Sequence, residues 1–302
     1  GWNTASSFNC RVSGAATVMA CTFNPELAYQ QGLQYGNIAL FTGTTILWGP
    51  APNIHRHQYN GRNLEYFSED PVLSGNMSMD ISAGALKKGL ISTPKHFAFN
   101  DQEIGRAGIA PFMTEQRARE IDLRAFQITF EGYKYNGKAT LGTMLSFSKL
   151  GGIECTAHSG LLTEILRNEW GFNGYVVSDY KDDFDLAPQA FKAGMTGFIW
   201  NNYNNDLKPG IDKFSSYKDV ELLESLKDIA HRELFVFANS NQMNFVNTTS
   251  RTVWIMTWWR QIYISVIVVF SAFIVISIVL YSLSLVLDKK VRLKTVKNGE
   301  VN

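Results

Sequence analysis

Short apolar runs alternate with longer amphipathic segments along most of the first 240 residues. The apolar runs predict strands at 15–22, 44–48, 90–98, 139–147, 174–180 and 195–200. The amphipathic segments predict helices at 25–40, 71–86, 114–131, 160–170, 184–193 and 217–239. Strands that alternate with helices predict right-handed crossovers and a parallel sheet. A barrel and a doubly wound open sheet share this alternation, so the pattern alone leaves both folds open.

Polar side chains follow several of these predicted strands. Lys95 and His96 end one strand, Asp179 ends another, and a polar loop around Arg62 follows 44–48. Chemistry at the carboxyl ends of several strands is typical of a barrel, where those ends converge on one pocket. Roughly six strand–helix units are fewer than a full circuit of eight. We therefore expect an α/β fold, a (β/α)8 TIM-like barrel incomplete at its N-terminus.

The segment 261–287 contains no charged residue and is dominated by Ile, Val, Leu and Phe. As a helix it would span roughly 40 Å, enough to cross a bilayer with some tilt. Aromatic residues stand near its start, as interfacial rings do: Trp254, Trp258, Trp259 and Tyr263. Basic residues follow it: Lys289, Lys290, Arg292, Lys294 and Lys297. This pattern predicts a single transmembrane helix with a cytoplasmic C-terminus, and its length and flanks argue against a buried core helix.

The expected organisation is a barrel domain at 1–245, a juxtamembrane linker at 246–260, a transmembrane helix at 261–287 and a basic cytoplasmic tail at 288–302. The predicted location is the cell membrane, with the barrel outside the cell. Such a topology requires translocation, yet the first residues show no basic-then-apolar pattern and the chain starts at Gly1. We therefore expect that an earlier segment has been removed or lies upstream.

Charge and cysteine content narrow the classes of function. Lys and Arg number 28 against 27 Asp and Glu, so nothing in the total favours a nucleic-acid partner. No zinc spacing, P-loop or dinucleotide fingerprint occurs, and no metal or cofactor is expected. Cys10, Cys21 and Cys155 are expected to pack as small apolar residues, with one disulfide left open.

The run GRNLEYFSEDP, from Gly61 to Pro71, places polar and aromatic groups on the loop after a predicted strand. Aromatic faces with fixed hydrogen-bonding groups suit a sugar, which has apolar ring faces and a polar rim. We interpret Arg62 and Glu65 as ligand contacts. The alternative is a capped surface turn, and for the second half of the run, where Asp70 precedes Pro71, we expect a helix start.

The other polar groups each have a structural alternative. Asp179 would be held rigidly as a nucleophile or metal ligand, or it could cap the next helix, as Asp182 or Asp183 could. Lys95 and His96 would point to opposite faces of a strand unless the backbone turns there, with an unusual peptide geometry.

Arg106 lies on a glycine-punctuated loop. It could point a second guanidinium inward, or it could pair with Glu103 on the surface.

Three stretches resemble glycoside hydrolase family 3 in sequence, order and spacing: GRNLEYFSEDP, PKHFAFNDQE with Arg106, and LLTEILRNEWGFNGYVVSDY. The resemblance covers roughly residues 16–241. The form KHFAFNDQE is similar to that of the β-glucosidase and β-xylosidase branch. It implies a retaining mechanism, in which Asp179 attacks the anomeric carbon and forms a glycosyl-enzyme. It also implies that Arg62, Lys95, His96 and Arg106 bind sugar hydroxyls. Glu65 and Phe147 complete the expected substrate contacts.

The sequence also departs from the pattern of that family. The family's Asp-Gly-Pro loop has no counterpart in this chain. The family's acid/base glutamate comes from a separate sandwich domain. Some bacterial members carry that domain first and the barrel with a membrane anchor second, and this chain is similar to their back half. We assign no acid/base residue. Ser148 stands where asparagine is common, and Thr196-Gly197 replaces a common aspartate.

Two hypotheses of different classes follow. The first is an exo-acting, β-glucosidase-like β-glycosidase whose acid/base comes from another domain or a partner chain. Its partners would be a β-linked oligosaccharide or glycoside and the bilayer, through 261–287. The second is a non-catalytic, membrane-anchored carbohydrate-binding or scaffold protein derived from the same fold. A metal-dependent enzyme using Asp179 and His96 has no adequate ligand set.

Overall fold

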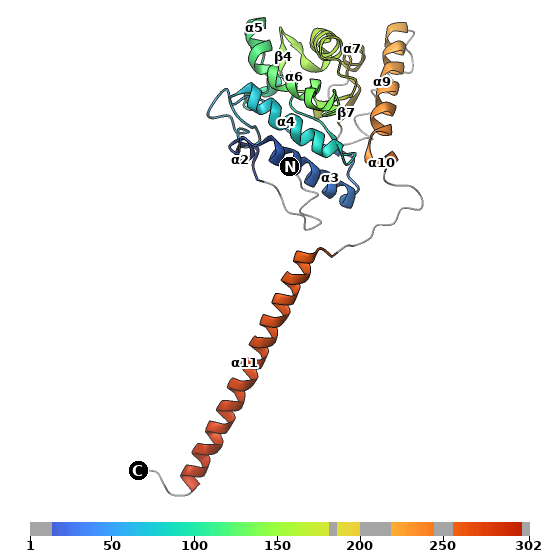
Figure 1. The fold of residues 1–302 in the computed structure, drawn as a ribbon. Coiled ribbons are helices and arrows are strands. Elements are labelled where there is room, and N and C mark those ends of the chain that lie inside the picture. Colours follow the sequence, from blue (N-terminus) through green and yellow to red (C-terminus); the bar gives the residue numbers. More distant parts are fainter. Residues whose placement is uncertain (1–13, 181–185, 200–218, 245–255, 298–302) are drawn as a thin grey trace. The chain divides into compact units, whose positions relative to one another are not determined.

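The computed structural model describes residues 14–180, 186–199, 219–244 and 256–297 (Figure 1). The chain divides into two compact units, Gly1–Ser250 and Arg251–Asn302. Predictions that fall on Cys10, Asp182, Asp183 and Trp254 lie outside the described residues.

The first unit consists of parallel strands joined by helices. Its α-helices are α2 (Ala16–Ala20), α3 (Pro25–Thr42), α4 (Pro71–Leu86), α5 (Glu115–Arg117), α6 (Arg124–Glu131), α7 (Ala187–Lys192), α9 (Val220–Ala238) and α10 (Asn241–Asn244). Short 3-10 helices are η1 (Arg106–Gly108), η3 (Tyr133–Tyr135) and η4 (Cys155–Ala157). Two π-helical segments are η2 (Ala118–Asp122) and η5 (Gly160–Glu169).

The strands are short and mostly parallel. They are β1 (Ile46–Leu47), β2 (Ile91–Ser92), β3 (Gly142–Met144), β6 (Tyr175–Tyr180) and β7 (Gly197–Ile199), and an antiparallel pair, β4 (Lys149–Leu150) and β5 (Ile153–Glu154). β1 pairs with β2, and β3, β6 and β7 form a second parallel sheet in that order. A parallel bridge between Phe97 and Leu145 joins the segment after β2 to the segment after β3. The described strands therefore follow one another in the order β1-β2-β3-β6-β7.

Most predicted elements are present, and α4 has the predicted bounds because Asp70 caps it and Pro71 begins it. The predicted strand at 15–22 is wrong. That segment forms the helix α2, whose Ala20 packs with Met77 and Ile81 of α4, so tertiary packing overrides its β-branched residues. The β4–β5 hairpin was not predicted, although Gly151 and Gly152, both at positive φ, are a typical two-residue turn.

A cluster of aromatic rings forms the core behind the strand ends. Phe97, fully buried, lies 5.2 Å from Phe126, 5.6 Å from Phe130 and 5.9 Å from Trp170 between ring centroids. Such contacts add to the free energy of burial and fix the position of Phe97. Because Phe97 directly follows His96, the core immobilises the backbone on which Lys95 and His96 stand.

Glycines allow α3 and α4 to cross at close range, and the two helices lie side by side in Figure 1. A Cβ on Gly84 would stand 2.2 Å from the Tyr29 carbonyl oxygen, and one on Gly32 would stand 2.1 Å from that of Ile81. Both obstacles are backbone atoms, which cannot move aside as a side chain can. α4 begins where the loop carrying Arg62 and Glu65 ends, so its placement also fixes that loop.

The second unit contains one long helix, α11 (Trp258–Lys297). Its segment Trp258–Leu293 is long and apolar enough to cross a membrane by length and composition, and the side chains of that segment are not buried within the protein. The predicted span 261–287 lies inside α11, and the domain boundaries stay a prediction. In the first unit Cys155 is a buried free thiol, as predicted. The prediction that Cys21 packs in the same way is wrong, because its thiol is exposed.

The close helix crossing predicts a large effect of one added methyl group. Gly84→Ala should lower the free energy of unfolding by about 1–3 kcal/mol because the two helices must separate. Gly108→Ala is the matched control, since its Cβ would meet open space. Thermal unfolding of the two variants measures the difference, and equal transition temperatures would show that the crossing is not tightly packed.

Candidate active site

Polar side chains from three strand ends, and an aromatic ring from a fourth, meet at one edge of the parallel strands. Arg62 and Glu65 follow β1, Lys95 and His96 follow β2, and Asp179 lies near the carboxyl end of β6. Arg106 begins η1, on the segment between β2 and α5, and Phe147 follows β3. The structure thus brings together the side chains that the sequence predicted to be catalytic or to contact the substrate: Asp179, Arg62, Lys95, His96, Arg106, Glu65 and Phe147.

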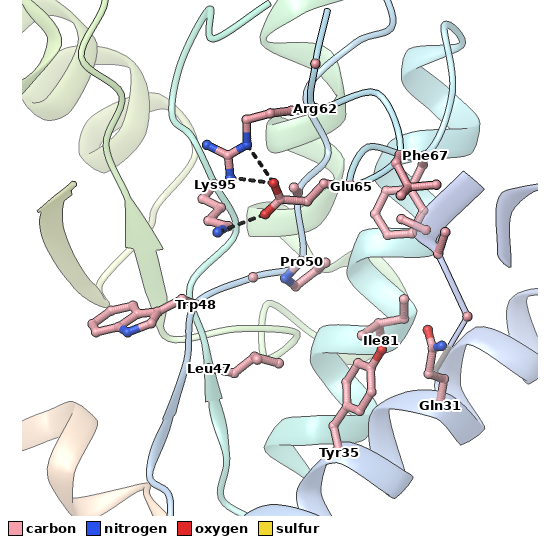
Figure 2. Close-up of a pocket in the computed structure, with 17 residues that line it drawn as sticks. Gln31, Tyr35, Leu47, Trp48, Pro50, Arg62, Glu65, Phe67, Ile81 and Lys95 are labelled. Carbon is pink, nitrogen blue, oxygen red and sulfur yellow. Dashed lines mark hydrogen bonds and ion pairs between the residues drawn. The ribbon is translucent and has the colours of Figure 1, made fainter. Parts of the chain in front are cut away.

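Glu65 lies between two cations, as Figure 2 shows. One carboxylate oxygen accepts from Lys95 Nζ at 2.9 Å, and the other accepts from Arg62 Nε at 2.6 Å and also contacts Arg62 Nη2. Burial would raise the pKa of Glu65, but the charges of Lys95 and Arg62 outweigh it and lower that pKa. Glu65 therefore stays ionised, with both oxygens already engaged.

His96 is held from its backbone and from its ring. Asn53 binds both sides of its backbone, accepting from His96 N at 2.6 Å and donating to its carbonyl at 3.1 Å. The peptide bond between Lys95 and His96 is cis, and both side chains reach the same cluster. Burial, together with the cations Arg62, Lys95 and Arg106, lowers the pKa of His96 well below its usual value. The ring is therefore neutral, and Arg62 Nη1 donates to its Nε2 at 2.9 Å.

Asp179 is buried, with 8% of its surface exposed, and it faces two polar groups. One carboxylate oxygen lies 3.7 Å from His96 Nε2 and 3.9 Å from Arg106 Nη1. The other oxygen accepts from the backbone N–H of Tyr180 at 2.8 Å. Among these contacts, only the one with the Tyr180 N–H lies within ordinary hydrogen-bond distance. The first oxygen thus has no hydrogen-bond partner among the described residues.

Arg106 and Glu103 complete the cluster. The Arg106 guanidinium lies over the Phe147 ring at 4.5 Å, and its Nη1 lies 3.1 Å from Glu103 Oε2. Glu103 Oε1 lies 3.6 Å from Arg62 Nη1. We call the resulting closed ring of neighbours the charge circuit: Arg62, Glu103, Arg106, Asp179 and His96, with Glu65 and Lys95 attached at Arg62.

A second cluster, built on the buried carboxylates of Asp101 and Asp122, anchors the same two loops. Arg56 Nε lies 3.0 Å from Asp101, and Arg56 also contacts Asp122, which accepts from Arg117 Nε at 3.2 Å. Arg56 belongs to the loop of Arg62, and Asp101 belongs to the segment of Glu103. Burial raises the pKa of Asp101 to about 6, since Arg56 offsets it only in part and Asp122 adds to it.

A cavity of about 520 Å³ adjoins the cluster (Figure 2). Arg62, Glu65 and Lys95 form its polar wall, and most of the remaining lining is apolar, including Leu47, Trp48, Tyr35, Phe67 and Ile81. His96, Arg106 and Asp179 do not line it. The cavity therefore borders the charge circuit only at Arg62, to which Lys95 and Glu65 are attached.

Sequence reasoning missed one supporting residue, Asn53, and one pairing, that of Glu103 with Arg62. Asn53 gave no signal beyond a polar residue between an apolar run and a loop. Glu103 was expected at most to pair with Arg106 on the surface, and it also reaches Arg62 from another loop. At the two positions that depart from the family pattern, the side-chain hydroxyls have hydrogen-bond partners. Ser148 donates to the Phe99 carbonyl, and Thr196 Oγ1 accepts from Val176 N and donates to the Val176 carbonyl.

The arrangement offers a carboxylate, three cations and an aromatic ring at one surface. Such a set can bind hydroxyl groups and present Asp179 to an electrophilic carbon. Within the described ranges, no group of three or more His, Cys, Asp or Glu side chains could hold a metal ion.

Comparison with known sequences gives a consistent result. The family described as "Glycosyl hydrolase family 3 N terminal domain" matches residues 12–221. Beta-glucosidase A of Butyrivibrio fibrisolvens is 38% identical over 211 residues, which cover 70% of this chain and 25% of the relative. Probable beta-glucosidase J of Emericella nidulans is 36% identical over 179 residues, 59% of this chain and 20% of the relative. The chain thus spans about a quarter or less of these relatives.

Solved structures show a similar fold. Beta-glucosidase 3B of Thermotoga neapolitana, in complex with glucose, matches with a TM-score of 0.69 and 33% identity, over 76% of this chain and 32% of that chain. A β-glucosidase of Bifidobacterium adolescentis matches with a TM-score of 0.70 and 27% identity, over 80% and 34% of the two chains. The first unit therefore has a TIM-barrel-like α/β fold.

The raised pKa of Asp101 predicts a pH-dependent stability difference. The fold favours the protonated carboxyl, so this group's stabilisation is complete below its ordinary pKa of 3.8 and is lost as pH rises through about 6. Asp101→Asn, which stays neutral, should gain stability relative to the wild type between pH 4 and pH 7, by at most about 3 kcal/mol. Unfolding curves at several pH values measure this gain, and a difference independent of pH would contradict the assignment.

Proposed function

The chain belongs to glycoside hydrolase family 3, and from that membership we propose that it carries the nucleophile and the sugar-binding face of a retaining β-glycosidase. The proposed substrate is a glycoside or oligosaccharide with a terminal β-linked sugar. Glucose is the sugar in the names of the relatives reported above. None of those names favours the alternative of a non-catalytic carbohydrate-binding protein.

The observation that carries the proposal is the placement of Asp179 in the charge circuit. Its oxygen that faces His96 and Arg106 has no partner within 3.5 Å in the described part of the chain, while both groups lie within 4 Å. A carboxylate held rigidly near a cation, but not tightly bound to it, is suited to nucleophilic attack. The position at the carboxyl end of a parallel strand is where barrel enzymes place such groups.

In the proposed first step, Asp179 attacks the anomeric carbon and forms a glycosyl ester as the bond to the leaving oxygen breaks. A second carboxylic acid protonates that oxygen. In the second step the same group, now a carboxylate, takes a proton from water, and the water cleaves the ester with net retention. Retention places the two carboxyl groups about 5 Å apart. We assign the acid/base to another domain or a partner chain.

We propose that Arg62, Lys95, His96 and Arg106 hold the sugar hydroxyls. Cationic N–H groups donate strongly to hydroxyl oxygens. Phe147, which stacks on Arg106, offers an apolar face beside them. Glu65 would contribute chiefly by holding Lys95 and Arg62, because both of its oxygens are engaged by them.

We further propose that α11 anchors the protein as a single-pass membrane helix, with the barrel outside the cell and the basic end in the cytoplasm. The length of its apolar segment and its exposed Trp258 and Trp259 support this. A membrane-impermeant maleimide should then label Cys21 on intact cells, while a Lys290→Cys variant should react at position 290 only after permeabilisation. Labelling of position 290 on intact cells would reverse the orientation.

The test of the catalytic proposal uses Asp179→Asn in the full chain. With 2,4-dinitrophenyl β-D-glucoside, whose leaving group departs without acid help, the variant should lose about 10³-fold or more in turnover because the nucleophile is gone. Calorimetry should show that glucose binding is largely kept. Asp70→Asn, a change in a helix cap away from the circuit, is the matched control. Unchanged turnover by Asp179→Asn would exclude Asp179 as the nucleophile.

A further inference from the structure

Glu103 lies between two arginines that come from different loops. Its Oε2 is 3.1 Å from Arg106 Nη1, and its Oε1 is 3.6 Å from Arg62 Nη1. The same Oε1 accepts from Asn100 Nδ2 at 2.9 Å, and Asn100 also donates to the Tyr66 hydroxyl at 2.9 Å. Because Tyr66 is fully buried, the Glu103 carboxylate is fixed relative to the core.

Arg106 lies near two carboxylates, those of Glu103 and Asp179. It lies 3.1 Å from Glu103 but 3.9 Å from Asp179, so the tighter partner is Glu103. Attraction between unit charges increases as their separation falls, and desolvation strengthens it further. Among the described residues, the only other carboxylate within 4 Å of the Arg106 guanidinium is that of Asp179.

We propose that Glu103 is a positioning residue that holds Arg106 away from Asp179 and so keeps the Asp179 carboxylate free. Without it, Arg106 closes onto Asp179 in a direct ion pair and occupies the oxygen that faces the site. Arg62 is less affected, since Glu65 holds it independently. The effect on activity rests on the proposed function of Asp179. The predicted movement of Arg106 toward Asp179 does not depend on that function.

The test is a double-mutant cycle in the full chain, with 2,4-dinitrophenyl β-D-glucoside as the substrate. Glu103→Gln should lower kcat by about tenfold, a typical loss for one strong charged interaction. Arg106→Gln loses a proposed sugar contact and should chiefly raise KM. The double variant should have a higher kcat than Glu103→Gln alone, because no guanidinium remains to block Asp179. Glu169→Gln, which breaks the exposed pair with Arg119, is the matched control.

Two further readouts separate positioning from general damage. In Glu103→Gln the acidic limb of the pH–rate profile should move to lower pH, since a cation closer to Asp179 favours its ionised form. Glu103→Asp, which keeps the charge, should restore part of the loss. A double variant slower than Glu103→Gln, or an unmoved acidic limb, would overturn the proposal.

A structure of Glu103→Gln separates this inference from the proposed function. Arg106 Nη1 should lie within hydrogen-bonding distance of Asp179 in the variant. If it stays near 3.9 Å, the positioning role is wrong even where Asp179 is the nucleophile. If the wild type has no turnover, the proposed function fails, and the Arg106 position alone decides the inference.

Discussion

The structure of the site depends on one constraint: charges removed from water must be paired. Three cations and three carboxylates crowd the ends of the strands, and each lies beside a group of opposite charge. Several of these side chains are only partly buried, so loss of one partner leaves a charge that water compensates in part, which is still destabilising. The charge circuit therefore fixes its members mutually. Because its links come from different loops, it also fixes those loops relative to one another.

The scaffold determines where this circuit forms. Phe97, in the aromatic core, immobilises the backbone next to His96, and Asn53 holds that backbone from the neighbouring loop. The glycine crossing of α3 and α4 fixes the helix that follows the Arg62 loop. The His96 ring is neutral because it is buried and because a positive charge there would be repelled by three cations nearby, Arg62, Lys95 and Arg106.

Local signals predicted much of the fold and of the site. Asp70 and Pro71 marked the start of α4 because a cap and a proline at the first turn act within a few residues. The position of Asp179 followed from the apolar run before it. The helix α2 was mistaken for a strand because its five residues carry little periodicity and their packing decides the outcome. The closure of the circuit by Glu103 and the clamp by Asn53 could not be predicted, since each joins segments that are about 40 residues apart.

The central claim is that Asp179 is the nucleophile of a retaining glycosidase, and covalent trapping tests it most directly. The full chain would be treated with 2,4-dinitrophenyl 2-deoxy-2-fluoro-β-D-glucoside, which forms the glycosyl-enzyme without acid help and slows its hydrolysis. Mass mapping of the digest should place one fluoroglucosyl group on Asp179. A label on another carboxylate of the circuit, such as Glu65 or Glu103, or no label at saturating reagent, would contradict the account.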